Sequence, residues 1–270
     1  MFGGGSGGAN SPYTINCTRH LKNIKYARSS YYKVLEDISY SGTWVPIAQF
    51  DGVLDFNSHS FTFSNNAIPV NANYGFINVN NGEIKSGTFV VDFTTLEGSS
   101  GGNYYIGIVC AVNNGIIDSC FIEKTNSNDI YIKDWYCVFG AITGLNKGEV
   151  SNCENYTVIR GNCVNFGGIV GYNDAGGTIY ASCSNRVQIY AETRGTISAS
   201  VGGIVGLDGE GSPIEQPTNS GALLFDCNTS NSRVTIYMEQ IAGRMCKADQ
   251  LINPIRTGSA TIKFGVICRL

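Results

Sequence analysis

The sequence contains few charged residues and almost no histidine, and each of these shortages excludes a class of function. Charged residues make up 14 % of the 270 positions, histidine occurs twice, and the formal net charge is −3. Lysine and arginine are scattered, so the chain lacks the basic stripe that binds nucleic acid or an anionic membrane surface. A zincin-type peptidase needs two histidines four residues apart with a glutamate between them, whereas His20 and His59 are widely separated. We therefore expect no nucleic-acid partner and no zinc-peptidase site.

Further absences exclude other classes of protein. No apolar run approaches the roughly 18 residues of a membrane span, so we expect no membrane insertion. The G-x-x-x-x-G-K-[ST] phosphate loop is missing. None of the ten cysteines belongs to a C-x-x-C pair, the short spacing at which zinc sites gather their ligands. The sequence predicts no metal site and no cofactor, and we assign no catalytic residue. A catalytic histidine needs a second side chain to orient it, and the sequence identifies none for His59. We therefore interpret His59 as a structural hydrogen-bonding residue.

Glycine is abundant, together with asparagine and serine. The chain contains 34 glycines, and 43 % of its residues are hydrophobic. This combination is typical of many short strands joined by tight turns. Residues 18–35 are the best helical candidate, with Leu21, Ile24 and Tyr26 along one side of a short helix. The glycine- and serine-rich residues 1–12 predict a flexible linker.

The glycines belong to an internal repeat. YGFINVNNGEIKSG (74–87) is matched 33 residues later around NNGIIDSC (113–120), and 33 later again at NKGEVSNC (146–153). Two further copies begin at GGIVGYNDAGGTIYASC (167–183) and VGGIVGLDGEGSP (201–213). In the first three copies one equivalent position is always glycine: Gly82, Gly115 and Gly148.

Each copy combines a glycine, a β-branched strand, an Asn/Gly turn and two further strands. We interpret glycine and asparagine as corner residues, since both tolerate left-handed backbone, and isoleucine and valine as wall residues. One such turn cannot bury its own apolar face, so successive turns must stack. The sequence therefore predicts an all-β fold, a parallel β-helix or β-solenoid expected to be right-handed, with about 30–35 residues per repeat.

An open solenoid exposes an apolar cross-section and unpaired strand edges, so both of its ends need protection. We assign residues 13–63 to an N-terminal capping segment, 64–245 to the solenoid repeats and 246–270 to C-terminal closing strands. The alternation in ATIKFGVICRL (260–270) also suits half of an interface for self-association through the solenoid ends.

The capping segment and the repeats together carry a family resemblance. HLKNIKYARSSYYKVLEDISYSGTWVPIAQFDGVLDFNSHSFTF (20–63) precedes GGIVGYNDAGGTI and GGIVGLDGEG, and the ordered combination resembles bacterial surface proteins with GLUG repeats. The resemblance spans about residues 20–240. Similar repeats also occur beside the catalytic domain of immunoglobulin-A-cleaving metallopeptidases. The matching residues of the capping segment are Leu21, Ile24, Tyr31, Tyr32, Leu35, Asp37, Ile38, Trp44, Pro46, Ile47, Phe50, Gly52, Asp55, His59 and Phe61.

This resemblance implies an extracellular stalk built from repeats. We predict a non-enzymatic extracellular or cell-surface module, adhesin-like or a rigid stalk, with a host or matrix glycan or protein as its partner. Two alternatives stay open: a subunit that stacks end to end into an extracellular filament, and a polysaccharide-active β-helix enzyme. The enzyme would need clustered carboxylates for calcium or acid–base work, and Asp51 and Asp55 are the nearest approach to a pair.

Three cysteines fall at the same place in consecutive turns. Cys120, Cys153 and Cys183 each follow an inward Ile or Val, and Gly87 fills the equivalent place one turn earlier. Parallel in-register pairs give poor disulfide geometry. We therefore predict an internal column of buried free thiols.

The strands that follow the cysteines can be aligned with one another, and the alignment predicts a column of outward-facing side chains. Cations beside aromatics on a flat face suit a sugar or a protein, through ring stacking and hydrogen bonding. The simpler interpretation is a solvated strand face whose side chains pair only with each other. Alignment on the inward Ile132, Ile159, Ile189 and Ile236 places Lys133, Arg160, Tyr190 and Tyr237 outside, with Trp135 close in sequence.

Overall fold

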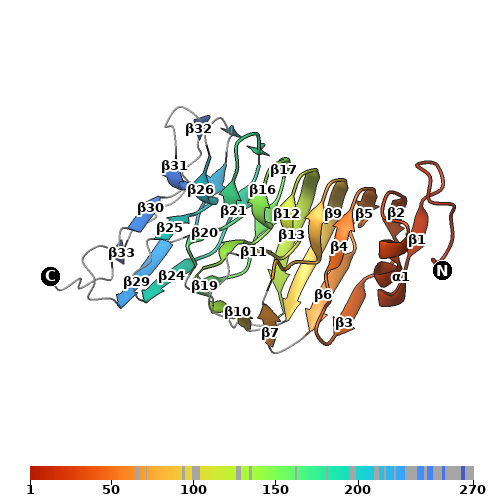
Figure 1. Ribbon diagram of the computed structural model, residues 1–270, viewed down its shortest axis with the longest axis horizontal. Coiled ribbons are helices and arrows are strands. Elements are labelled where there is room, and N and C mark those ends of the chain that lie inside the picture. Colours follow the sequence, from red (N-terminus) through yellow and green to blue (C-terminus); the bar gives the residue numbers. More distant parts are fainter. Residues whose placement is uncertain are drawn as a thin grey trace.

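The chain forms a parallel β-solenoid that coils from one end of the molecule to the other (Figure 1). Strands of successive coils pair in parallel throughout, which confirms the predicted fold class. No helix among the described residues is long and apolar enough to span a membrane. The computed structural model describes residues 1–64, 67–70, 72–92, 95–98, 104–125, 129–133, 136–161, 163–180, 182–194, 199–209, 213–215, 217–221, 223–228, 236–239, 242–245, 251–252 and 263–264.

Four sheets form the walls of the coil. The long sheet follows the order β1 (Tyr13–Ile15), β2 (Tyr31–Val34), β5 (Val53–Asp55), β9 (Glu83–Asp92), β13 (Ile116–Lys124), β17 (Glu149–Ser151), β22 (Thr178–Ile179), β27 (Ile214–Glu215) and β32 (Leu251–Ile252). Beside this path it also contains β3 (Ile38–Ser41), β6 (Ser60–Ser64), β18 (Glu154–Asn155), β23 (Ser184–Asn185) and β28 (Thr218–Asn219).

The other three sheets follow the same coil order. The β4 sheet contains β4 (Ile47–Phe50), β8 (Ile77–Asn80), β12 (Cys110–Asn113), β16 (Thr143–Asn146), β21 (Val170–Asn173), β26 (Val205–Asp208) and β31 (Ala242–Met245). The β7 sheet contains β7 (Ala67–Val70), β10 (Thr95–Gly98), β14 (Ile130–Lys133), β19 (Ile159–Gly161), β24 (Ile189–Arg194), β29 (Leu223–Asn228) and β33 (Lys263–Phe264). The β11 sheet contains β11 (Tyr105–Gly107), β15 (Val138–Gly140), β20 (Asn165–Gly167), β25 (Ala199–Gly202) and β30 (Ile236–Glu239).

The repeated glycines lie at the predicted corners, in the bends between β8 and β9, β12 and β13, and β16 and β17, and they stack on one another. Left-handed backbone, however, is not the reason that glycine occupies them. A Cβ added to Gly82 would lie 2.0 Å from the carbonyl oxygen of Gly52. At Gly115 and Gly148 it would lie 2.1 Å from the carbonyl oxygen of the glycine one coil earlier. None of these three residues has a positive φ. Glycine is required here because successive backbones approach too closely for any side chain.

Serine and asparagine make the left-handed corners. Ser86, Ser119, Asn152 and Ser182 have φ values of 55, 52, 51 and 67°. Each one directly precedes the position that is glycine in the first of these coils and cysteine in the other three. A single left-handed residue turns the chain sharply, at a modest cost for a small polar side chain. Asparagine was predicted at left-handed corners, whereas serine was expected only among the residues of tight turns in general.

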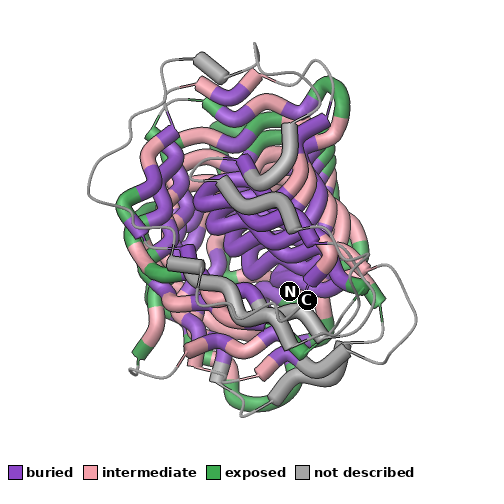
Figure 2. Tube along the Cα trace, turned by 90° about the vertical axis from the view of Figure 1, so that its left-hand side faces the viewer, coloured by how far each residue is buried: buried purple, intermediate pink, exposed green. Residues whose placement is uncertain are grey.

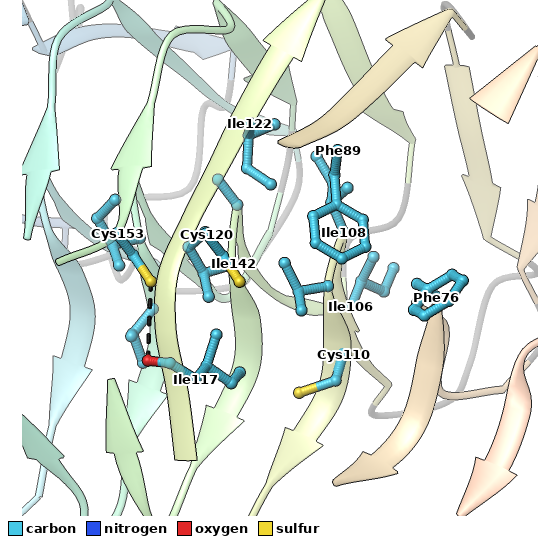
Figure 3. Close-up of a cluster of buried hydrophobic side chains, with 14 of the residues drawn as sticks. Phe76, Phe89, Ile106, Ile108, Cys110, Ile117, Cys120, Ile122, Ile142 and Cys153 are labelled. Atoms are coloured by element: carbon cyan, nitrogen blue, oxygen red, sulfur yellow. Dashed lines mark hydrogen bonds between the residues drawn. The ribbon is translucent and has the colours of Figure 1, made fainter. Parts of the chain in front are cut away.

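Buried residues lie along the inner strands of the coil, as the purple segments of Figure 2 show, and their side chains form one core. In the N-terminal coils these are mainly rings: Trp44 stacks on Phe76 at 5.3 Å between centroids, and its Nε1 donates to the Phe76 carbonyl at 2.9 Å. Further along, isoleucine, valine and cysteine predominate, as around Ile117 and Cys120 in Figure 3, although Phe139 and Phe166 form one more buried ring pair. The core is continuous across this change.

The solenoid begins well before residue 64. β1 pairs with β2, β2 with β5, and β5 with β9, so residues 13–63 already form stacked coils beneath a small helical cap. That cap is α1 (Thr18–Asn23) followed by the 3-10 turn η1 (Ile24–Tyr26). Leu21 and Ile24 are buried as expected, but Tyr26 is 78 % exposed. The helix is shorter than residues 18–35 because the chain enters β2 at Tyr31.

The first residues pack on this end instead of extending as a linker. The Gly3 amide donates to the Thr14 carbonyl, and the Thr14 amide donates to the Gly4 carbonyl, both at 3.0 Å. The ring of Phe2 stacks on Tyr13 at 4.4 Å. Backbone pairing therefore covers the edge of β1, which glycine-rich composition alone does not predict.

The predicted closing strands are described only in part. In the range 246–270, Leu251–Ile252 (β32) pairs with β27 and Lys263–Phe264 (β33) pairs with β29. Both continue sheets of the solenoid. The other residues of this range lie outside the described residues.

Two ladders of buried amide side chains run along the coil axis. In each, the Nδ2 of one asparagine donates to the Oδ1 of the residue one coil later, and most Nδ2 groups also donate to a carbonyl two residues on in their own corner. Every corner is thus tied to the next one without burying an unpaired amide. The first ladder is Asn80, Asn113, Asn146, Asn173 and Asp208, with steps of 2.8, 2.9, 2.8 and 2.9 Å. The second is Asn155, Asn185 and Asn219, with steps of 2.9 Å.

Candidate functional site: a lateral face of the solenoid

A column of ring, cation and ring lies on the β7 sheet. β14 and β19 pair so that Ile130 faces Ile159 and Tyr131 faces Arg160. β24 continues the register and sets Tyr190 beside Arg160. Alternate residues of a strand point to opposite faces, so the buried isoleucines leave their neighbours on the outside. We call Tyr131, Arg160 and Tyr190 the lateral column.

The lateral column differs from the one that the sequence predicted. Lys133 lies further along β14, where it pairs with Glu97, so Tyr131 takes its place beside Arg160. Tyr237 lies in β30 and pairs with Ser200, in the β11 sheet instead of the β7 sheet. Leu224 of β29 is the neighbour that follows Tyr190.

The remaining member of the predicted patch, Trp135, lies outside the described residues. Of the five predicted binding residues, the structure therefore brings together Arg160 and Tyr190, and it adds Tyr131. Lys133 stays close by, because its Nζ lies 5.8 Å from the centroid of the Tyr131 ring.

The guanidinium of Arg160 contacts both tyrosine rings and so links the three side chains of the lateral column. The guanidinium carbon of Arg160 lies 5.8 Å from the ring centroid of Tyr131 and 5.4 Å from that of Tyr190. Its Nη1 lies 3.7 Å from Asp129 Oδ2, and its side chain is 43 % exposed. Cation–π contacts at such exposure contribute about 0.5–1 kcal/mol each. The guanidinium is thereby held between two rings while part of it stays open to solvent.

A second surface cluster on the long sheet escaped the sequence analysis. Arg186 Nε donates to Glu154 Oε2 at 2.5 Å, and the Tyr156 hydroxyl donates to the same oxygen. The hydrogen bond from Arg186 lowers the pKa of Glu154, and the one to Glu154 raises the pKa of Tyr156. The Arg186 guanidinium also lies 5.6 Å from the Tyr156 ring. Glu154 and Arg186 are 32 residues apart, so only the stacking of coils brings them together.

The three predicted column cysteines are fully buried, and their thiols are free. Cys120 stands directly opposite Gly87 of the preceding coil. The sulfur of Cys153 contacts the Ile117 carbonyl at 3.8 Å (Figure 3), and that of Cys183 contacts the Val150 carbonyl at 3.6 Å. Burial raises the pKa of the Cys153 thiol well above its usual value. These are packing residues and not nucleophiles.

The two carboxylates of the enzyme alternative have separate local partners. Asp51 Oδ1 accepts from Asn81 at 2.7 Å and from Gln49 at 2.6 Å, and the bond from Asn81 is the main cause that lowers its pKa. Asp55 Oδ1 accepts from the amide of Asn57 at 2.7 Å, which forms the corner after β5. Within the described residues, no group of three or more His, Cys, Asp or Glu side chains is arranged to bind a metal ion.

His59 lies next to an acidic side chain at the N-terminal end. Its Nδ1 is 3.4 Å from Asp37 Oδ1, which also accepts the Ser60 amide at 2.8 Å. The bond from Ser60 is the main cause that lowers the pKa of Asp37. The arrangement joins the start of β6 to the residue just before β3, and the structural role of His59 stays a prediction.

Comparison with known proteins bears on the fold. No protein-family model matches the chain, and no curated protein sequence matches it. Among solved structures, it is similar to the crystal structure of a putative immunoglobulin A1 protease from Bacteroides ovatus, with a TM-score of 0.53 and 18 % sequence identity. The match covers 92 % of this chain and 88 % of that chain. At this identity the likeness shows a shared backbone fold, which for this chain is the β-solenoid.

Proposed function

We propose that the chain is a non-enzymatic extracellular or cell-surface module that acts as an adhesin-like stalk and binds a glycan at the lateral column. The observation that carries this proposal is the geometry of Tyr131, Arg160 and Tyr190. Two rings flank one partly exposed guanidinium on a flat parallel face. Rings stack on the apolar faces of sugars, and a guanidinium offers hydrogen-bond donors to their hydroxyl groups.

The spacing favours an oligosaccharide over a monosaccharide. Tyr131 and Tyr190 belong to strands on either side of β19, so they lie two strand spacings apart, roughly 10 Å. One sugar ring cannot cover both tyrosines. A chain of sugars lying along the coil axis would stack on each ring in turn and pass over Arg160 between them.

The stacked coils and the structural comparison support the stalk and its location. The amide ladders and parallel sheets tie each coil to its neighbours, which gives length and a straight lateral face from repeated units. The solved structure that resembles this chain is described as a putative immunoglobulin A1 protease. Because immunoglobulin A1 is an extracellular protein, the likeness favours an extracellular setting for this solenoid too.

The test is binding to a glycan array by the parent chain and by the double variant Tyr131→Ser/Tyr190→Ser. We expect the double variant to lose at least tenfold in affinity for any glycan that the parent binds. The matched control is Tyr26→Ser/Tyr180→Ser, because these tyrosines are 78 % and 37 % exposed and lie away from the β7 sheet. Equal binding by parent and double variant would show that the lateral column is not the site.

The enzyme and filament alternatives are tested separately. Incubation of the chain with immunoglobulin A1 and with a panel of polysaccharides should leave every one of them intact, as measured by gel electrophoresis and by the release of reducing ends. Turnover of any substrate would overturn the non-enzymatic proposal. Concentration-dependent rods in electron microscopy would favour the filament instead.

A further inference from the structure

Two cysteines outside the predicted column contact each other. Cys137 and Cys163 are buried, and their sulfur atoms lie 2.8 Å apart although the residues are separated by 26 positions. That distance is shorter than a van der Waals contact between two sulfur atoms. The thiols of the column cysteines also interact with one another, but Cys120, Cys153 and Cys183 each direct the sulfur toward a backbone carbonyl as well.

The local sequence explains the contact. Cys137 begins CVFG and Cys163 begins CVNFG, so the second copy has one extra residue before its phenylalanine. β15 and β20 pair through Phe139 and Phe166, and the Val164 amide donates to the Cys137 carbonyl at 2.9 Å. Cys163 is therefore one residue out of register with Cys137. This diagonal placement avoids the in-register stacking that is unfavourable for a disulfide between parallel strands.

We propose that Cys137 and Cys163 form a disulfide that cross-links two successive coils when the chain folds in an oxidising compartment. The oxidant is a low-molecular-weight disulfide such as oxidised glutathione. One cysteine thiolate attacks it, forms a mixed disulfide and releases one glutathione thiolate. The second cysteine thiolate then attacks the cysteine sulfur of the mixed disulfide and releases the other glutathione. The two cysteines are oxidised, one disulfide is reduced, and the two protons end on the released thiols.

The cross-link joins the short strands of the β11 sheet. β15 and β20 contain three residues each, so their pairing is limited to a few backbone hydrogen bonds. A covalent bond just before both strands fixes their register. We expect it to form selectively, since the thiol of Cys110 contacts the Thr143 hydroxyl at 3.5 Å and the column thiols, although they interact with one another, belong to equivalent positions of successive coils, where disulfide geometry is poor.

Peptide mapping tests the proposal directly. The reduced chain is refolded in a glutathione redox buffer, denatured in guanidinium with N-ethylmaleimide, digested and analysed by mass spectrometry. We expect a linked peptide that joins Cys137 to Cys163 and has lost two hydrogens. Cys110, Cys120, Cys153 and Cys183 should carry the maleimide. Maleimide on both Cys137 and Cys163 would overturn the proposal.

Matched serine variants give an independent measurement. Cys163→Ser should leave Cys137 fully alkylated, whereas the control Cys183→Ser should keep the Cys137–Cys163 peptide. Reduction of the oxidised parent should lower the midpoint of its urea unfolding, and this shift should vanish in Cys163→Ser. A shift of unchanged size in Cys163→Ser would overturn the proposal, because the cross-link responsible would then lie elsewhere. The peptide map of the parent decides the matter even if a variant fails to fold.

Discussion

The N-terminal coils and the middle coils of the solenoid fill their interior with different proportions of aromatic and aliphatic side chains. The first are filled by rings, such as Trp44, Phe61 and Phe76, which pack at centroid distances of 5.0 to 5.3 Å. The middle coils use mainly isoleucine, valine and cysteine, with one pair of rings, Phe139 and Phe166, at 5.5 Å and amide ladders at the corners. The backbone spacing between coils is the same in both regions. The comparison shows that backbone stacking fixes the outline of each coil. The side chains of neighbouring coils together fill the space inside it, so that a large residue in one coil can offset a small residue in the next.

The boundary between the two regions shows how that volume is shared. A Cβ added to Gly87 would lie 2.7 Å from Cγ of the Phe56 ring. One coil later the facing residue is Cys120. The column of cysteines therefore ends in a glycine because the phenylalanine of the preceding coil occupies the space that a side chain would need.

Removal of a ring from the N-terminal coils should have the largest effect on stability. Trp44→Ala leaves a large cavity against Phe76 and removes the donor to the Phe76 carbonyl. We expect the free energy of unfolding to fall by about 3–5 kcal/mol in urea denaturation. Cys153→Ala, the matched change in the middle coils, should cost only about 1 kcal/mol. Equal losses would show that the two regions are not filled differently in energetic terms.

A break in the amide ladder should be the most costly change in the middle coils. Asn146 accepts from Asn113 and donates to Asn173 inside the coil. Asn146→Ala removes the donor to Asn173 Oδ1 and the donor to the Gly148 and Thr178 carbonyls, whereas Asn113 Nδ2 keeps its bonds to two other carbonyls. We expect a loss of about 2–4 kcal/mol by chemical denaturation. Asn114→Ala removes a similar amide contact to Asn81 on the exposed surface, and there the loss should stay within about 0.5 kcal/mol. A surface loss as large as the buried one would argue against the ladder.

The boundary itself can be tested by filling it. Gly87→Ala forces the new methyl group against Phe56, and we expect a loss of about 1–3 kcal/mol. The same change in a Phe56→Leu background should cost less, and a double-mutant cycle measures the difference. Gly8→Ala is the control, since a Cβ there meets nothing within 4 Å. Additive effects of the two changes would mean that Gly87 and Phe56 do not compete for space.

The smallest expected effect is a gain that depends on pH. Burial raises the pKa of Asp208 from 3.8 to about 6, so the folded chain binds its proton more tightly than the unfolded chain. The stability that this proton contributes is complete below about pH 4 and is lost as the pH rises through 6. Asp208→Asn should therefore stabilise the chain by about 1–2 kcal/mol at pH 7.5 and by nothing at pH 3.5.

Thermal unfolding of parent and variant across this pH range measures the difference. Asp174→Asn is the control, because Asp174 is partly exposed and lies 3.6 Å from Lys147. A gain for Asp208→Asn that is the same at both pH values would contradict the assignment of the proton to Asp208.

The sequence was sufficient for the coil and for several of its positions. A spacing of 33 residues predicted the stacked glycines and the equivalence of Gly87 and Cys120. Alignment of the strands after the cysteines predicted the inward Ile132, Ile159 and Ile189. It could not tell which inward isoleucine of β14 faces Ile159. Ile130 and Ile132 both point inward, and a slip of two residues keeps every side chain on its own face. In the structure the stacked coils pair Ile130 with Ile159, and so Tyr131, and not Lys133, lies beside Arg160.

The amide ladder and the role of glycine were hidden for a different reason. The repeated asparagines, such as Asn80 and Asn113, are equally good turn residues, so composition alone favours an exposed corner. Only the close stacking of coils turns that corner inward and pairs amide with amide. Because successive coils lie so close together, there is no room for a Cβ at Gly115. The amide ladder and the requirement for glycine both depend on contacts between neighbouring coils, whereas the sequence pattern is most informative about the structure within one coil.

The first amide ladder has a consequence for how such a chain tolerates insertions and deletions. Its rungs are separated by 33, 33, 27 and 35 residues along the sequence, yet each step spans 2.8 or 2.9 Å. The ladder therefore acts as a register mark that does not depend on the length of the coil. Residues can be gained or lost between two marks while the marks themselves stay aligned. Loops between the rungs are thus the natural places for lineages, or engineers, to lengthen this protein without disturbing its axis.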